Sequence, residues 1–240
     1  MAAFFVDTRQ RSTQEELMDD FAMAGDTIRG AVDQIALVNR FLGGNQVTIS
    51  GVAQLLADVP VTQPVRVVDL GCGNGDMLRV LARWGRQRSK NLTLIGIDAN
   101  PFIIDYARQC SVDYPEISYQ CELVTPANFD QQSYDIVLCT LFLHHFPDDN
   151  LSDLLHTVSR AARLGVVIND LHRHRLAYYL FYLLTLPIPN RMVREDGLIS
   201  ILRGFKRHDL EALAQQVLPS QVSSQIRWRW AFRYQWLIKN

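Results

Sequence analysis

The sequence predicts an α/β fold in which helices cover both faces of a mainly parallel sheet. From Pro64 to about residue 170, short apolar runs typical of buried strands alternate with segments that have helical periodicity. A glycine-rich turn follows the first of these strands. The last segment, 226–236, alternates apolar and polar side chains, which is the period of a strand with one polar face.

Composition sets the broad class of the protein. A chain of 240 residues with 48% hydrophobic side chains can bury a large core in one domain, with or without a cap. The formal net charge of −1 gives no reason to expect nucleic acid or an anionic membrane as a partner. The four cysteines lack C-x-x-C spacing, residues 1–13 lack a signal peptide, and no apolar run reaches about 18 residues. We therefore expect a cytoplasmic protein with reduced, mostly buried thiols, no membrane span and no metal.

The region before the first strand is expected to be helical. Three helices are predicted there, over residues 13–24, 27–42 and 50–58. Gly43-Gly44 ends the second helix, and Ser50 is the expected N-cap of the third. Residues 1–62 thus form a helical N-terminal cap, loosely ordered over 1–12. The cap is either a packed extension or a cover that closes a substrate pocket.

The alternating region supplies the strands and helices of the main domain. Strands are predicted over 65–70, 92–97, 117–122, 134–140 and 166–169. The connecting helices are predicted over 76–87, 101–112 and 149–163. Asn100 and Pro101 give the second of these helices its cap and its first residue. Ligands of such sheets bind beyond the carboxyl ends of the strands, so the residues just after the strands are the functional candidates.

The glycine-rich turn is Asp69-Leu70-Gly71-Cys72-Gly73-Asn74-Gly75. Glycine tolerates positive φ and lets a ligand approach the backbone and the following helix N-terminus. The spacing departs from the dinucleotide fingerprint G-x-G-x-x-G, because the third glycine comes one position early and Asp76 stands where a small residue is needed. An acid at this place repels a pyrophosphate but suits a ligand that carries a cation.

Asp98 ends the second strand, 23 residues after Gly75. A carboxylate at this place can accept hydrogen bonds from both hydroxyls of a ribose, which suits any adenosine ligand, NAD included. The alternative is that Asp98 only caps the following helix.

Three segments together resemble the class I S-adenosylmethionine-dependent methyltransferases. Asp69 to Gly75 has every residue of the family's first motif, D-x-G-x-G-x-G, and Asp98 follows at normal spacing. The stretch 134–148 resembles the fourth-strand region of ubiquinone- and menaquinone-type methylases and related small-molecule O-methyltransferases. The resemblance covers about 65–170. It implies a Rossmann-like domain over 63–240, with a mainly parallel seven-stranded sheet and antiparallel C-terminal strands.

The resemblance also implies the cofactor, S-adenosylmethionine, and its product S-adenosylhomocysteine. The residues then expected at the cofactor are Asp69, Gly71, Cys72, Gly73, Asn74 and Gly75 for the methionine part, Asp98 and Ala99 for the ribose, Glu122 or Leu123 for the adenine, and Thr140 and Leu141 for the sulfonium side.

Methyl transfer from a sulfonium needs two reactants held in line, and a base helps if the acceptor is a phenol. Histidine suits that role near neutral pH. His144 and His145 follow the fourth strand and His172 follows the fifth, so these three are the candidate catalytic bases. Asp170 is placed to orient His172. The alternative is that the histidines line the pocket without taking a proton.

The insertion 171–205 is expected to form the acceptor site with the N-terminal helices. Its apolar segment 176–187 is predicted to be a buried helix; the alternatives are a wall of the acceptor site, a dimer face or a surface for lipid-like substrates. Residues 188–205 have the mixed composition of a mobile cover. The candidate contacts for a flat aromatic acceptor are Tyr178, Tyr179 and Tyr182.

The period-two segment 226–236 is interpreted as two antiparallel strands that meet near Ala231, with one long strand as the alternative. Its alternating arginines and tryptophans resemble an RNA-binding pattern. Arginine stems packed over a sheet edge explain the pattern better at this net charge.

The sequence therefore predicts an S-adenosylmethionine-dependent methyltransferase that acts on a small aromatic or polyketide-like metabolite, by O-methylation of a phenol. The alternatives are C-methylation of a quinol-like ring, a cofactor-binding module without catalysis and, least favoured, a NAD-dependent oxidoreductase. The expected partner is a small-molecule acceptor, with no nucleic acid, and the chain is expected to be a monomer or a homodimer.

Overall fold

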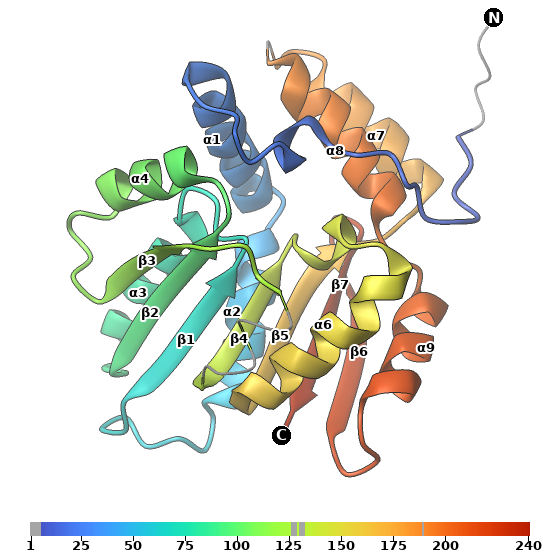
Figure 1. Ribbon diagram of the computed structural model, residues 1–240. Helices are drawn as coiled ribbons and strands as arrows, with labels where there is room; N and C mark the ends of the chain where they lie inside the picture. The colour runs from blue at the N-terminus through green and yellow to red at the C-terminus, as the bar shows by residue number, and fades with distance from the viewer. Residues whose placement is uncertain (1–5, 126–128, 130–132, 189) are drawn as a thin grey trace, which may run out of the picture.

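Seven strands of the computed structural model form one sheet in the order β3-β2-β1-β4-β5-β7-β6 (Figure 1). The structure describes residues 6–125, 129, 133–188 and 190–240. Strands β1 to β5 are parallel, whereas β7 runs antiparallel to both β5 and β6. The strands are β1 (Val65–Leu70), β2 (Leu92–Asp98), β3 (Ile117–Cys121), β4 (Tyr134–Thr140), β5 (Ala162–Leu171), β6 (Ser223–Arg229) and β7 (Arg233–Lys239). The predicted mainly parallel sheet with antiparallel C-terminal strands is confirmed.

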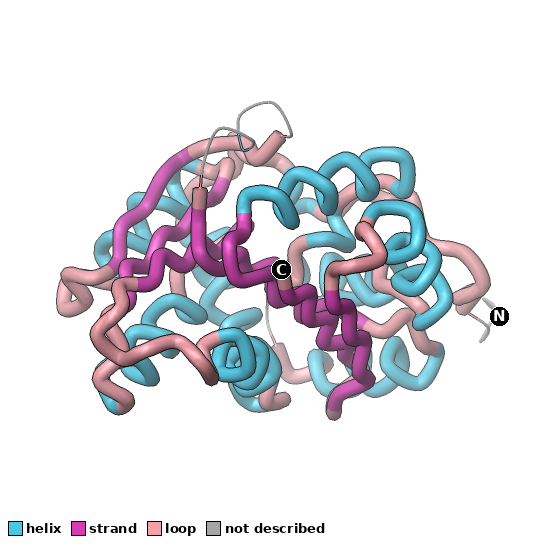
Figure 2. The backbone as a smooth tube through the Cα atoms, turned by 90° about the horizontal axis from the view of Figure 1, so that it is seen from below, coloured by secondary structure: helices cyan, strands magenta, loops and turns pink. Residues whose placement is uncertain are grey.

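Helices cover both faces of the sheet, as the view from below in Figure 2 shows. Strand β4 illustrates why: Val137 and Cys139 belong to the core on one face, and Ile136 and Leu138 to the core on the other, as the strand period of two requires. The first face packs against α6 (Asp148–Ala161) and α9 (Arg207–Val217), and the second against α2 (Gly44–Leu55), α3 (Asp76–Gln87) and α4 (Pro101–Cys110).

A further layer lies above the carboxyl ends of the parallel strands (Figure 1). It contains η1 (Leu17–Asp19), α1 (Asp26–Phe41), α7 (Arg175–Thr185) and α8 (Arg191–Arg203). Segments far apart in the sequence meet in this layer, because Asp196 of α8 accepts hydrogen bonds from the backbone N–H groups of Leu17 (2.8 Å) and Met18 (3.0 Å). Within the described part of the chain, no helix is long and apolar enough to cross a membrane.

The N-terminal segment differs from the prediction. Instead of a helix over 13–24 there is only the single turn η1. Asp196 and the capping pair of Glu16 and Asp19 fix this turn, and the extended backbone of Asp20 ends it. The expected loose order is also wrong for the described residues 6–12. The Arg11 guanidinium there donates to the backbone oxygens of His144, Phe146 and Arg203. Residues 1–5 lie outside the described residues.

Helix α2 begins earlier than predicted, at Gly44 rather than at Ser50. Gly43 has a left-handed backbone (φ 73°) and is the N-cap of α2, so the second helix begins directly after the end of α1. Gly44 fits there because it has no side chain. A Cβ at Gly44 would stand 1.9 Å from the Oδ1 atom of Asn39.

The insertion also differs from the prediction. The apolar segment does form a helix, α7, but the prediction that this helix is buried is wrong. Leu180 and Leu183 are 49% and 59% exposed. The reason is that α7 lies in the outermost layer, with one side toward the interior and the other toward solvent. Most of the expected mobile cover is the regular helix α8, and α9, which the sequence patterns missed, follows it. Residue 189 lies outside the described residues.

The C-terminal prediction of two strands is confirmed, with the turn at Ala231 (φ 60°) and Phe232 (φ 54°). The cysteines are free thiols; Cys72 and Cys139 are buried, whereas Cys121 is exposed, so the expected burial holds for only part of the set.

Gly165 provides a test of the packing between β5 and β7. Its φ is 147°, and a Cβ there would stand 2.0 Å from the backbone oxygen of Ile238. Gly165→Ala is expected to lower the free energy of unfolding by about 1–3 kcal/mol, measured by urea denaturation. The control is Gly30→Ala in α1, where a Cβ meets no atom closer than 3.8 Å. The control should raise stability by up to about 1 kcal/mol, because alanine favours helices. Equal effects of the two substitutions would contradict the packing described.

Candidate active site

A cavity of about 700 Å³ opens at the carboxyl edge of the sheet, against the layer of η1, α1, α7 and α8. His144 and His145 line it. Gly75 does not, because it caps α3 and packs against Tyr119, whose hydroxyl oxygen would lie 2.0 Å from a Cβ. The other residues expected at the cofactor all line the cavity: Asp69, Gly71, Cys72, Gly73, Asn74, Asp98, Ala99, Glu122, Leu123, Thr140 and Leu141.

The turn after β1 presents its backbone to this cavity. Gly71, Gly73 and Gly75 have φ values of 66°, 52° and 74°, which glycine adopts without strain. A Cβ at Gly73 would meet nothing within 4 Å, so open space lies beside the turn. The N–H groups of Gly73 and Asn100 donate to the two carboxylate oxygens of Asp98, both at 3.0 Å. Burial raises the pKa of Asp98, and these hydrogen bonds oppose the rise. Each oxygen keeps a lone pair for a further donor.

Asp69 is a buried acid without a partner for one of its oxygens. It is 3% exposed, and its Oδ1 atom accepts no hydrogen bond from any described residue. Burial raises the pKa of Asp69 to about 8, and the neighbouring charge of Asp98 adds to the rise. At neutral pH the carboxyl group therefore holds a proton in most molecules. A positive charge in the cavity would favour its ionised form.

Asp76 is paired within the protein. Its Oδ1 atom lies 2.8 Å from Nη2 of Arg40, and its Oδ2 atom accepts a hydrogen bond from Nδ2 of Asn45 at 3.0 Å. These bonds hold the end of α1 and the start of α2 beside the glycine turn. Thr48 of α2 extends the contact to β4, with 3.0 Å between its hydroxyl oxygen and that of Thr140.

His144 is held by Asp170, at the end of β5. Nδ1 of His144 lies 2.7 Å from Oδ1 of Asp170, and the backbone N–H of His144 donates to Oδ2 of Asp170 at 3.2 Å. Burial raises the pKa of Asp170, but its interactions with His144 outweigh burial and lower the pKa. The predicted pairing of Asp170 with His172 is therefore wrong. The two histidines follow neighbouring parallel strands, β4 and β5, and only the tertiary structure decides which one Asp170 contacts.

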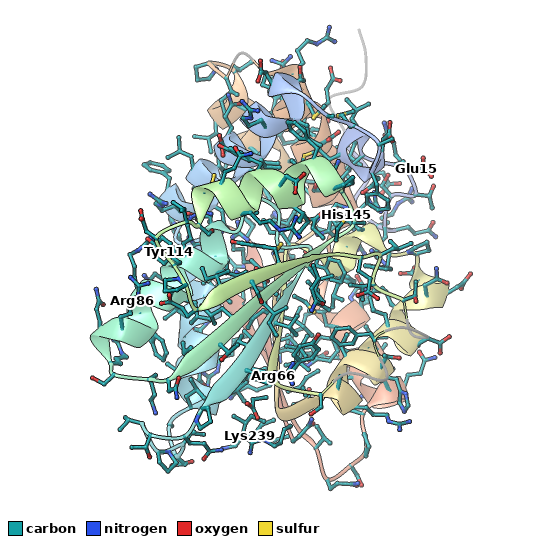
Figure 3. All side chains as sticks on the ribbon, turned by 60° about the vertical axis from the view of Figure 1, so that its left-hand side comes forward. Glu15, Arg66, Arg86, Tyr114, His145 and Lys239 are labelled. Atoms are coloured by element: carbon teal, nitrogen blue, oxygen red, sulfur yellow. The ribbon has the colours of Figure 1, made fainter. Side chains whose placement is uncertain are left out.

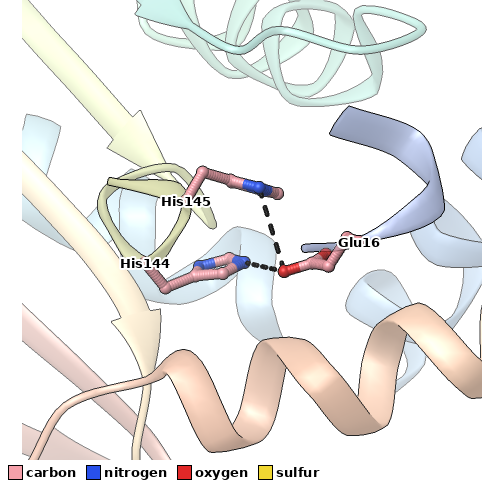
Figure 4. Close-up of side chains that lie close together, drawn as sticks. All are labelled: Glu16, His144 and His145. Carbon is pink, nitrogen blue, oxygen red and sulfur yellow. Dashed lines mark ion pairs between the residues drawn. The ribbon is translucent and has the colours of Figure 1, made fainter. Parts of the chain in front are cut away.

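Glu16 is the N-cap residue of η1, and no sequence pattern predicted it as part of the site. Figure 4 shows both imidazoles converging on it. Its Oε1 atom lies 3.7 Å from Nε2 of His144 and 3.8 Å from Nδ1 of His145, and it accepts no hydrogen bond. Ser200 of α8 donates to Oε2 at 2.6 Å. Burial raises the pKa of Glu16. No sequence motif marks Glu16, because it precedes His144 by 128 positions.

His145 is held by Asp19, whose Oδ1 atom lies 2.8 Å from its Nδ1 atom. Arg203 binds the other oxygen of Asp19 at 2.7 Å. Burial raises the pKa of Asp19, but the hydrogen bonds from His145 and Arg203 outweigh it and lower the pKa. In Figure 3, His145 lies at the upper end of the strands, far from Arg66 and Lys239 at the lower edge.

In the described part of the chain, Glu16, His144 and His145 are the group spaced to hold a metal ion, with candidate ligand atoms within 4.8 Å of one another. Two contacts disfavour a cation there. Nη1 of Arg203 lies 3.6 Å from Oε1 of Glu16, and Nδ1 of His145 is already bonded to Asp19. The arrangement suits proton transfer better than metal binding.

His172 and the three candidate tyrosines are not brought to the cavity. His172 packs edge-on against Tyr234, with ring centroids 5.0 Å apart, and accepts a hydrogen bond from Nε1 of Trp228 at 3.2 Å. Burial lowers the pKa of His172 to about 4, so the ring is neutral. None of Tyr178, Tyr179 and Tyr182 lines the cavity; other faces of α7 do so, through Leu180 and Phe181.

The part of the cavity away from the glycine turn has mainly apolar walls. They come from α1, η2 (Leu143–His145) and its flanks, α7 and the hairpin between β6 and β7. The large side chains on these walls include Val32, Phe142, Phe146, Leu184, Trp230 and Phe232. Such a surface suits a flat, apolar molecule.

Residues 67–165 match the model of a family described as a methyltransferase domain. The chain is 30% identical over 162 residues to the ubiquinone biosynthesis O-methyltransferase of Hydrogenovibrio crunogenus, covering 62% of this chain and 60% of that protein. It is 25% identical over 127 residues to an uncharacterised methyltransferase of Synechocystis sp., covering 53% and 56%. The chain therefore spans somewhat more than half the length of these two relatives.

Among solved structures, the plantazolicin methyltransferase BpumL in complex with SAH is similar, with a TM-score of 0.66 over 89% of both chains. The sequence identity is 17%. The shared feature at this identity is the fold, which is the class I, Rossmann-like fold expected from the sequence.

The raised pKa of Asp69 predicts a pH dependence of stability. Between about pH 4 and pH 8 the folded protein holds a proton on Asp69 that the unfolded chain releases. The free energy of unfolding must therefore fall as pH rises, by up to about 1.4 kcal/mol per pH unit for this group. Asp69→Asn should remove that part of the slope, measured by urea denaturation at pH 5 to 8. Asp58→Asn, at an exposed site, should keep it. Parallel curves for wild type and Asp69→Asn would refute the assignment.

Proposed function

We infer that this chain, whose residues 67–165 match the model of a methyltransferase domain and which has a Rossmann-like fold, is an S-adenosylmethionine-dependent methyltransferase. We propose that it methylates the phenol oxygen of a small aromatic or polyketide-like metabolite. The observation that carries the proposal is the pair His144 and Asp170, which lies in the same cavity as the glycine turn after β1.

The residues around the turn fit such a cofactor. The space beside Gly73 is open, and the orphaned Oδ1 atom of Asp69 suits the positive charge of an ammonium or sulfonium group. In the proposed complex Asp98 accepts hydrogen bonds from the ribose hydroxyls with the lone pairs that its two backbone donors leave free. Thr140 and Leu141, at the end of β4, are proposed to face the sulfonium, and Glu122 or Leu123 the adenine.

His144 is the proposed base. Its bond to Asp170 fixes the Nδ1–H tautomer, which leaves a lone pair on Nε2. Nε2 takes the proton as the O–H bond of the acceptor breaks and the oxygen forms a bond to the methyl carbon. S-adenosylmethionine supplies that methyl group, and the electrons of the broken C–S bond stay on sulfur. The carboxylates of Asp170 and Glu16 flank the imidazole and stabilise the positive charge that it acquires.

The acceptor is proposed to lie against the apolar walls formed by α1, α7 and the β6–β7 hairpin. Aromatic rings such as Phe142 and Trp230 favour a flat ring by stacking or edge contacts. The curated relative named for ubiquinone biosynthesis supports oxygen as the methylated atom.

Cofactor choice is tested by calorimetric titration with S-adenosylmethionine, S-adenosylhomocysteine and NAD. The first two should bind and NAD should not. Asp98→Ala should weaken S-adenosylhomocysteine binding by about tenfold or more, since charge-assisted hydrogen bonds contribute about 1.5–3 kcal/mol. Asp105→Ala, on the exposed side of α4, should leave the affinity unchanged. An unchanged affinity in Asp98→Ala would contradict the ribose contact.

Catalysis is tested with a panel of phenols and S-adenosylmethionine labelled in its methyl group. His144→Ala should lower kcat by about 10²–10⁴-fold, the usual contribution of a general base, while cofactor affinity stays within a factor of a few. His156→Ala, exposed on α6, should have no effect. His172→Ala should lower kcat less than tenfold, because His172 lies outside the cavity. Equal losses in His144→Ala and His172→Ala would exclude His144 as the sole base.

A further inference from the structure

Arg233, the first residue of β7, is a buried cation with no ion-pair partner in the part of the chain that the structure describes. It is 3% exposed, it lines the cavity, and its Nε and Nη1 atoms make no hydrogen bond. Among the described residues no carboxylate oxygen lies within ion-pair distance of its guanidinium. Asp170 is the acid that acts on it electrostatically, and Asp170 is already engaged by His144.

The other buried arginines show how unusual this is. Arg173 donates to the backbone oxygens of Thr8 (3.1 Å) and Gly204 (2.6 Å) and pairs with Asp209 at 3.0 Å. Arg203 pairs with Asp19 and donates to the backbone oxygen of His144. A buried charge without such partners costs several kcal/mol, so an isolated one indicates a ligand that supplies the missing charge.

Arg233 cannot avoid this cost by losing its proton at neutral pH. Burial lowers its pKa to about 10, which leaves the guanidinium positively charged. The guanidinium packs closely against the start of α2, since a Cβ at Gly44 would stand 3.0 Å from Cζ of Arg233. Its fork of donors therefore stays in the cavity wall beside Asn39, whose Oδ1 atom is also buried without a partner.

We propose that Arg233 binds an anionic group of the methyl acceptor, a carboxylate, so that the substrate is a hydroxyaryl acid rather than a neutral phenol. This inference rests on the proposed function and names its substrate class. A planar carboxylate can accept two parallel hydrogen bonds from a guanidinium.

The sheet order favours the acceptor over the cofactor as the source of that carboxylate. Strand β7 is separated from β1 by β4 and β5, which is about 14 Å at the usual strand spacing. The residues proposed for the cofactor lie at the ends of β1, β2, β3 and β4, whereas Arg233 adjoins the apolar hairpin residues Trp230, Ala231 and Phe232. The methionine carboxylate of the cofactor is the competing source, and the test separates the two.

The first measurement is thermal unfolding of the ligand-free protein. Arg233→Met removes an unpaired buried charge and should leave Tm unchanged or higher. Arg229→Met is the matched control on the same hairpin, where Arg229 donates to Oε1 of Gln235. A clear fall of Tm in Arg233→Met, larger than that in Arg229→Met, would mean that Arg233 is structural and would overturn the proposal.

The second measurement is calorimetry with S-adenosylhomocysteine and with 5′-methylthioadenosine, which lacks the amino-acid part. Arg233→Met should bind both within about twofold of wild type. A tenfold loss for S-adenosylhomocysteine alone would assign Arg233 to the cofactor carboxylate and overturn the proposal.

The third measurement compares acids with their neutral amides in the S-adenosylhomocysteine complex. The probes are 1-hydroxy-2-naphthoate against 1-hydroxy-2-naphthamide, and 4-hydroxybenzoate against 4-hydroxybenzamide. Wild type should bind at least one acid about tenfold or more tightly than its amide, Arg233→Met should lose the preference, and Arg233→Lys should retain part of it. Normal S-adenosylhomocysteine binding with no preference for either acid would refute this inference alone. Absence of S-adenosylhomocysteine binding in wild type would instead refute the proposed function and, with it, this inference.

Discussion

The burial of charged side chains at the carboxyl edge of the sheet is the constraint on which the rest of the structure depends. Residues 6–20, α7 and α8 cover that edge, so charged groups beneath them must pair or carry the cost of burial. Arg203 shows the consequence. It donates to the backbone of His144 and pairs with Asp19, and these bonds join α8, η1 and the loop after β4. The same bonds that stabilise the covering layer therefore set the positions of the histidines.

The covering layer and the candidate site form one polar network. Ser200 comes from α8, Glu16 from the N-cap of η1, His144 from the loop after β4 and Asp170 from β5, and each contacts the next in this order. The His144 ring, the proposed base, is thus held by Asp170 on one side and faces Glu16 on the other, so it has little freedom to turn. Preorganisation of this kind lets a buried imidazole meet an acceptor without reordering its surroundings.

Asp69 and Arg233 are cavity residues that depart, among the described residues, from the pairing that burial otherwise enforces. Asp69 lies at the glycine turn and Arg233 lies three strands away on β7. Asp69 becomes negative only when it ionises, whereas Arg233 is positive, and the two side chains line different parts of one cavity. Unsatisfied groups reduce the stability of the ligand-free protein, and binding sites are where proteins retain such groups. Their separation gives the cavity one region suited to a cation and another suited to an anion.

The sequence by itself determined the sheet, its order of strand and helix, and the loops that line the cavity, because these follow from local periodicity and from glycines that need positive φ. It marked Asp69, Asp98 and His144 for the same reason: each lies at or shortly after the carboxyl end of a strand. It did not determine the length of η1, the exposure of α7, the partner of Asp170 or the roles of Glu16 and Arg233. Those depend on which distant segments cover the carboxyl edge and bury the side chains there, and only the tertiary structure decides that.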